Sequence, residues 1–201
     1  MPEKTQRSFF YFLAIACVPA YALSVLWSTD QRVYYVTGGI AACLQTVALY
    51  ALYRISKVVI RTLKPRSLSH GLYGFFITAY VIKTIAQLLS AFPYVAKQTT
   101  ALKPFLIIGY LHLFTLAFMT VCLLFLLYRT ALIRLSMLGK SGLLLLIIGI
   151  LVTEFTLFGR GLLVVLQVPA FENHPVVLVQ FSLLMLIGIA LIFLDQFRNR
   201  F

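Results

Sequence analysis

The sequence predicts an all-α integral membrane bundle of six transmembrane helices. Of the 201 residues, 62% are hydrophobic and 11% are charged, whereas soluble domains are about half apolar and about a quarter charged. The apolar residues form long runs, and a helix of about 20 residues crosses the hydrocarbon core of a bilayer. Basic residues gather in alternate links between these runs, a pattern that fixes membrane orientation. We therefore expect one transmembrane domain over residues 1–201, with both termini in the cytoplasm.

The first apolar run covers residues 9–27 and follows a basic start, as in a signal peptide. It is longer than the apolar region of a signal peptide, which has about 7–15 residues, so we expect an uncleaved first span. A short link, residues 28–32, then favours an antiparallel hairpin with the second span. The remaining spans are expected at 33–53, 72–92, 104–128, 142–167 and 176–194.

The link after the second span, residues 54–66, is the most basic stretch of the chain. Its sequence, RISKVVIRTLKPR, places basic residues at i, i+3, i+7 and i+10, which is one face of a helix. Apolar residues occupy much of the rest, so we expect a short amphipathic helix on the cytoplasmic surface, ending before Pro65. It is a candidate contact for anionic lipid or a partner protein, through Arg54, Lys57, Arg61 and Lys64.

The distribution of Lys and Arg gives the orientation. Six spans place both termini on one side, and that side collects twelve of the 17 basic residues, whereas the other side collects three. The twelve are Lys4, Arg7, Arg54, Lys57, Arg61, Lys64, Arg66, Arg129, Arg134, Lys140, Arg198 and Arg200. This asymmetry predicts that both termini are cytoplasmic, N-in and C-in. The same placement in short loops argues against nucleic acid as the partner of the net charge of +12.

Several ionisable residues fall inside the expected spans, where a charge costs several kcal/mol unless it is paired or hydrated. At about 1.5 Å per residue across a core of about 30 Å, Lys83 lies ~16 Å from the cytoplasmic edge. By the same count, His112 and Glu154 each lie ~18 Å from the cytoplasmic edge. Gln87 and Arg160 lie closer to the outer face. Glu154 is the only acidic residue inside any of the expected spans, so it is the natural counter-charge for Lys83 or Arg160.

This shared depth leaves three interpretations open. The polar residues form structural contacts that fix helix register, or they line a pathway for an ion, a proton or a small polar solute. In the second case Lys83, Gln87, His112, Glu154 and Arg160 are the pathway residues. The third interpretation is a redox subunit that binds haem or quinone near His112. We place transport first, and keep the redox subunit and a non-catalytic scaffold subunit of a membrane complex as alternatives.

Known catalytic and metal-binding patterns give no support for an enzyme. The three cysteines each fall within an apolar run and show no ligand spacing. A haem with two histidine ligands needs a second histidine at the depth of His112, and His70 and His174 fall in expected loops instead. We therefore assign no catalytic residue and no metal, and predict no cofactor, with haem at His112 as the exception to be tested.

Three segments resemble a pattern found in uncharacterised polytopic bacterial membrane proteins. They are KTIAQLLSAFPY at 83–94, GYLHL at 109–113 and the acidic segment TEFTLFGRG that contains Glu154 and Arg160. Those proteins are generally longer. The resemblance implies a bacterial inner-membrane setting and no particular activity. The Tyr-Leu-His sequence is also similar to haem-binding respiratory membrane subunits. Expected partners are the bilayer, other membrane subunits or a second copy of the chain.

Overall fold

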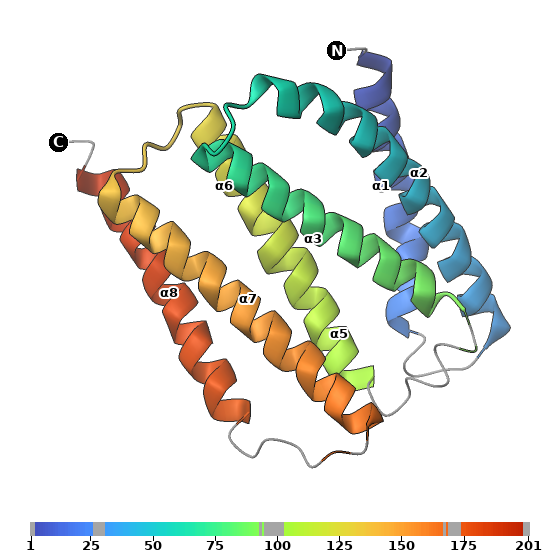
Figure 1. Cartoon of the computed structure of the whole chain (residues 1–201). Helices are drawn as coiled ribbons and strands as arrows, with labels where there is room; N and C mark the ends of the chain where they lie inside the picture. The colour runs from blue at the N-terminus through green and yellow to red at the C-terminus, as the bar shows by residue number, and fades with distance from the viewer. Residues whose placement is uncertain are drawn as a thin grey trace. The chain divides into compact units, whose positions relative to one another are not determined.

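The computed structural model describes residues 3–25, 31–92, 94, 103–166, 168 and 174–198. Every regular element in this part of the chain is helical (Figure 1). The helices are α1 (Glu3–Val25), α2 (Arg32–Thr62), α3 (Leu68–Ser90), α5 (Lys103–His112), η2 (Leu113–Thr120), α6 (Val121–Arg129), α7 (Met137–Val165) and α8 (His174–Arg198). The all-α prediction is thus confirmed for the described residues.

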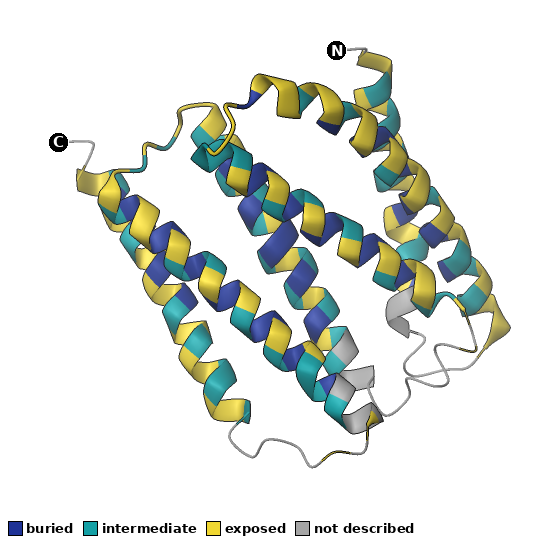
Figure 2. Cartoon of the chain, viewed as in Figure 1, coloured by how far each residue is buried: buried dark blue, intermediate teal, exposed yellow. Residues whose placement is uncertain are grey.

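Five helical segments of the described chain are long and apolar enough to cross a bilayer. They are Arg32–Thr62, Leu68–Ser90, Ile107–Arg129, Met137–Gly161 and His174–Arg198. Large apolar side chains lie exposed along them, such as Phe155 on α7 and Leu186 on α8. Figure 2 shows exposed positions along the length of these two helices. Such surfaces are stable against lipid and not against water. The chain is therefore a multi-pass membrane protein, whereas a sixth span and the orientation stay predictions.

The chain divides into two compact units. The first contains residues Met1–Gly71 and Ile77–Lys103, and the second contains Leu72–Phe76 and Pro104–Phe201. In the first unit α1 packs along α2 through small side chains. Ala16 of α1 is fully buried, as are Ala41 and Ala42 of α2 to within 1%. Small residues let two helix backbones approach closely where there is no water to drive apolar association.

In the second unit α7 packs along α8 at very short range. A Cβ built on Gly142 of α7 would lie 2.6 Å from the carbonyl oxygen of Gly188 on α8. A Cβ on Gly188 would lie equally close to the Gly142 carbonyl oxygen. The backbones therefore touch, and only glycine fits at either position. An aromatic cluster of Tyr73, Phe76, Phe118 and Phe125 packs elsewhere in this unit, with ring centroids 5.1–6.3 Å apart.

The basic stretch after the second span is not a separate helix, so that prediction is wrong. It forms the last three turns of α2, which runs without a break from Arg32 to Thr62. The physical reason is that neither Gly nor Pro stands between Tyr53 and Leu63 to stop the helix. The helix ends at Leu63, two residues before Pro65, as expected. The four basic side chains Arg54, Lys57, Arg61 and Lys64 are all exposed.

The described helices differ in detail from the predicted spans. The predicted fourth span is not one regular α-helix, because its centre, Leu113–Thr120, is a π-helix. The helix of the predicted sixth span continues beyond residue 194 to Arg198. The predicted links at 28–30, 95–102 and 169–173 lie outside the described residues.

Candidate functional site

The polar side chains of the first unit gather around Lys83 on α3. Lys83 is only 3% exposed, and its Nζ donates a hydrogen bond to Oε1 of Gln45 on α2. Gln45 is equally buried. A lysine in an apolar helix needs such an acceptor, because an unsatisfied polar group has no water to bind in the hydrocarbon region. The structure supplies Gln45 of the neighbouring helix as this acceptor.

Other polar side chains of α3 lie buried on the same face as Lys83. Tyr80 is fully buried, and its ring centroid lies 5.8 Å from Lys83 Nζ. Phe9 of α1 packs edge-on against the same ring at 6.3 Å. Gln87 is buried one turn beyond Lys83. Sequence reasoning missed Thr84, whose hydroxyl is buried and donates to the Tyr80 carbonyl at 2.8 Å.

Glu154 on α7 is the acidic group of the second unit. It is 8% exposed, both carboxylate oxygens are buried, and neither has a hydrogen-bond partner among the residues described in its unit. Its helix face continues with Ile150 and Leu157, which are 0% and 3% exposed. A buried polar group without a partner is costly and demands a physical explanation.

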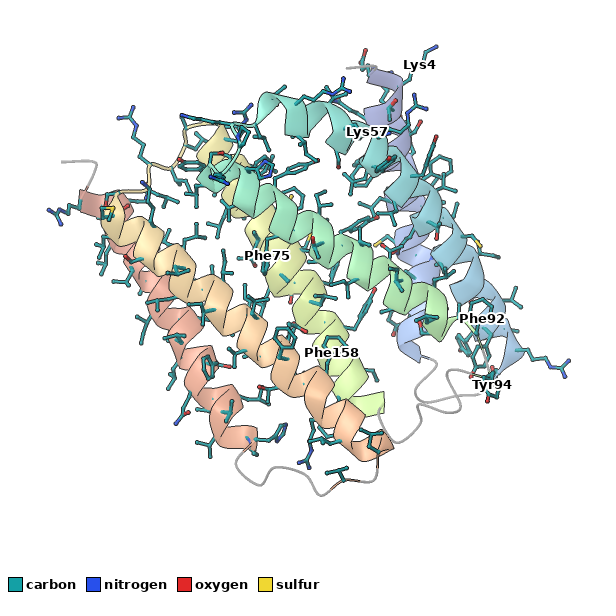
Figure 3. The ribbon with its side chains drawn as sticks, viewed as in Figure 1. Lys4, Lys57, Phe75, Phe92, Tyr94 and Phe158 are labelled. Carbon is teal, nitrogen blue, oxygen red and sulfur yellow. The ribbon has the colours of Figure 1, made fainter. Side chains whose placement is uncertain are left out.

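Two contacts set the register between α7 and α5. A Cβ on Gly109 of α5 would lie 3.5 Å from the ring of Phe158 and 3.8 Å from Cβ of Leu157. The Phe105 ring lies 5.7 Å from the guanidinium carbon of Arg160. As the number rises along α5 it falls along α7, so the two helices are antiparallel here. Figure 3 shows Phe158 reaching from α7 towards α5.

Extended by one turn, this register brings His112 and Glu154 to the same level of the seam between α5 and α7. His112 is one turn beyond Gly109, and Glu154 is one turn before Leu157 and Phe158. Residues three apart share a helix face, so both side chains belong to the faces that meet. Nδ1 of His112 is buried without a hydrogen-bond partner among the described residues.

The π-helix begins at the residue after His112. Its wider turn is supported by threonine hydroxyls, since Thr120 Oγ1 donates to the Thr115 carbonyl five residues back at 2.9 Å. Thr115 Oγ1 donates to the Leu111 carbonyl at 2.7 Å. Short π segments inside α-helices are frequent at functional sites. The sequence carried no signal for it, because the apolar pattern of this span is nearly continuous.

Asp195 is a buried acid directly after the predicted end of the sixth span at residue 194. Its side chain is fully buried at the end of α8, on the same face as Gly188 and Ile192. Its carboxylate accepts from the backbone N–H of Ser136 at 2.9 Å and from the Ser136 hydroxyl. Ser136 directly precedes α7, so the negative charge lies at the positive end of that helix. The spacing of Gly188, Ile192 and Asp195 was the signal that could have revealed it.

A second pair of bonds holds the same loop. Gln196 Nε2 donates to the Arg134 carbonyl at 2.9 Å, and Gln196 Oε1 accepts from the Arg134 N–H at 3.1 Å. Asp195 and Gln196 together fasten the link between α6 and α7 to the end of α8. We interpret this as a structural clamp.

The predicted site residues thus fall into two groups. Lys83 and Gln87 belong to the first unit, and His112, Glu154 and Arg160 belong to the second. The pairing of Lys83 with Glu154 stays a prediction. Among the described residues there is no group of three His, Cys, Asp or Glu side chains that could hold a metal ion.

Comparison with protein-family models, with curated proteins and with solved structures gives no match to this chain. The chemistry of the buried side chains therefore carries the functional proposal.

Proposed function

We propose that the chain is a six-span protein of the bacterial inner membrane, with both termini cytoplasmic, and that it conducts a proton, an ion or a small polar solute. The observation that carries this proposal is the burial of Lys83 and Glu154 in helices that are otherwise apolar. Ionisable residues within spans are rare and expensive, and they mark transport pathways and proton relays. The proposed pathway residues are Lys83, Gln87, His112, Glu154 and Arg160.

The contacts suggest how Lys83 takes part. Gln45 is a neutral acceptor, so its bond to Lys83 takes up one of the three ammonium hydrogens and brings no negative charge of its own. In the proposed cycle Lys83 exchanges between Gln45 and an acidic partner, for which Glu154 is our candidate.

The test is proton flux into proteoliposomes, driven by a potassium diffusion potential and followed with an internal pH-sensitive dye. We expect Lys83→Met and Glu154→Gln each to lower the flux. Gln180→Leu is the matched control, because Gln180 is a polar residue of a span whose side chain is exposed on α8. If both variants conduct protons like the unaltered protein, the pathway proposal fails for protons. Repeating the assay with potassium and sodium in place of the proton gradient extends the test to ions.

A second candidate function rests on His112. Its buried Nδ1 is a nitrogen that could ligate haem iron or bind a quinone carbonyl. The test is an absorbance spectrum of the purified protein, air-oxidised and dithionite-reduced. A Soret band that shifts on reduction and is lost in His112→Ala favours the redox subunit. A featureless spectrum removes haem.

We also propose that the basic face of α2 binds anionic lipid at the cytoplasmic surface. Lys57 Nζ lies 4.5 Å from the ring centroid of Tyr53, an arrangement suited to the headgroup level. Lys4 of α1 lies at the same end of the first unit (Figure 3). The test is retention of phosphatidylglycerol against phosphatidylcholine in native mass spectrometry. We expect a variant with Gln at Lys57 and Arg61 to lose the preference. Unchanged retention would instead favour a partner protein on this face.

A further inference from the structure

We infer that Glu154 is a proton-binding carboxyl, and that it exchanges its proton with His112 across the seam between α7 and α5. This inference deepens the proposed function, because it names the proton as the substrate. Only the statement that the proton crosses the membrane rests on the proposed function. Proton binding by Glu154 is a property of the site and can be measured without any flux.

The first step is the position of the two side chains. Contacts of Phe105 with Arg160 and of Gly109 with Leu157 and Phe158 lie two turns and one turn away from the pair. Both contacts give the same antiparallel register, which brings His112 to the level of Glu154. His112 has a buried nitrogen and Glu154 has two buried oxygens, and all three atoms are without a partner among the described residues.

The second step is that the described part of the second unit offers Glu154 no other partner. Arg160 is six residues from Glu154, which is about 9 Å along the helix axis, and its guanidinium faces Phe105. On α8 no ionisable residue stands between His174 and Asp195. On η2 the hydroxyls of Thr115 and Thr120 donate to backbone carbonyls. His112 is therefore the titratable side chain that this face of α7 meets within the described part of its unit.

The third step is the chemistry. A carboxyl that is buried without a donor is stable as the neutral acid, because a bare carboxylate in an apolar seam is far more costly. Transfer breaks the O–H bond of Glu154 and forms an N–H bond on His112. The products are a carboxylate and an imidazolium, which attract each other at close range. The imidazolium then releases a proton to water, and Glu154 is reloaded from water, with no electron transfer.

The test is labelling with dicyclohexylcarbodiimide, an apolar reagent that attacks protonated carboxyls within the membrane. The O–H of the acid adds across one C=N bond of the reagent, and the adduct rearranges to a stable N-acylurea. The chain has only five acidic residues, so peptide mass spectrometry assigns the label to one of them. Asp195 is the matched control, since it is also buried in the second unit but accepts two hydrogen bonds from Ser136.

We expect label on Glu154 and none on Asp195. Above its midpoint the labelling rate should fall about tenfold per pH unit, as for one titrating group. Glu154→Gln should lose the label, and His112→Gln should shift the pH midpoint of labelling, whereas Gln180→Leu should leave it in place. No label on Glu154 would overturn the inference, and so would a midpoint that His112→Gln does not move.

The two proposals fail separately. Label on Glu154 without proton flux in proteoliposomes would overturn the proposed function and keep the inference. Proton flux that is lost in Glu154→Gln, together with no label on Glu154 at any pH, would keep the function and overturn the inference.

Discussion

Replacing Gly142 by alanine should destabilise the second unit, whereas the same replacement at Gly159 in the same helix should not. At Gly142 the new Cβ would lie 2.6 Å from the Gly188 carbonyl oxygen, 2.9 Å from Leu191 Cβ and 3.1 Å from the Ile192 backbone nitrogen. Two of these three atoms belong to the backbone of α8, so no side-chain rotation relieves the clash. At Gly159 no described atom outside the neighbouring backbone of the same helix lies within 4 Å of the built Cβ.

The magnitude follows from two opposing terms. Overpacking a close contact costs about 1–3 kcal/mol, and alanine in place of glycine within a helix gains about 0.5–1 kcal/mol. Gly142→Ala should therefore lower the free energy of unfolding by about 1 kcal/mol, within a range of about 0–2.5 kcal/mol. Gly159→Ala has only the second term and should raise it by up to about 1 kcal/mol.

Gly149→Ala should change the free energy of unfolding by an amount between those of Gly142→Ala and Gly159→Ala. The obstacle nearest to its Cβ is Cγ of Met185, the flexible part of a side chain, and the Phe181 carbonyl oxygen follows at 3.1 Å. Because Met185 can move aside, we expect a smaller loss than at Gly142. The assay is reversible unfolding in mixed micelles with increasing sodium dodecyl sulfate, followed by circular dichroism. An equal effect at all three positions, or a stabilised Gly142→Ala, would refute the close packing of α7 on α8.

Three further perturbations test other contacts. Asp195→Ala removes a charged acceptor from Ser136 and should lower the free energy of unfolding in the same assay by about 1.5–3 kcal/mol. Asp195→Asn should lower it less, because an amide oxygen still accepts a hydrogen bond. Lys83→Met and Gln45→Leu should show a coupling energy of about 0.5–2 kcal/mol in a double-mutant cycle, and additive effects would contradict their bond. Reporter fusions after residue 201 test the side on which the C-terminus lies. A green fluorescent protein fusion should fluoresce in cells, and an alkaline phosphatase fusion should be inactive. The reverse result would exclude a cytoplasmic C-terminus.

The helical class followed from composition and run length because a bilayer leaves a chain few choices. Backbone groups in lipid must bond within their own segment, so a long apolar run is helical whatever its detailed order. Helix ends were harder to predict, because continuation of a helix depends on the lack of a stop signal. The basic residues within 54–62 suggest that a new helix starts there. The segment instead extends α2, because no Gly or Pro interrupts it.

Side-chain partners were predictable only where one helix carries the whole pattern. The stripe of Tyr80, Lys83 and Gln87 could be read from spacing on α3 alone, and all three residues are buried. The partner of Lys83 could not be predicted from spacing, because Gln45 lies 38 residues away and its contact depends on how α2 packs. The sequence therefore indicates that a buried lysine needs an acceptor, and packing decides which acceptor it finds.

The two buried acids of the second unit show how the same functional group serves different roles. Asp195 and Glu154 both carry a buried carboxyl group on an apolar helix. Asp195 is satisfied by the N–H and hydroxyl of Ser136 at the start of α7, so its charge stabilises a fixed loop. Glu154 has no such donor among the described residues of its unit, so it gains nothing from a fixed charge there. A carboxyl without a fixed donor, level with an imidazole and beside a π-helix, is suited to gain and lose a proton rather than to hold a structure together.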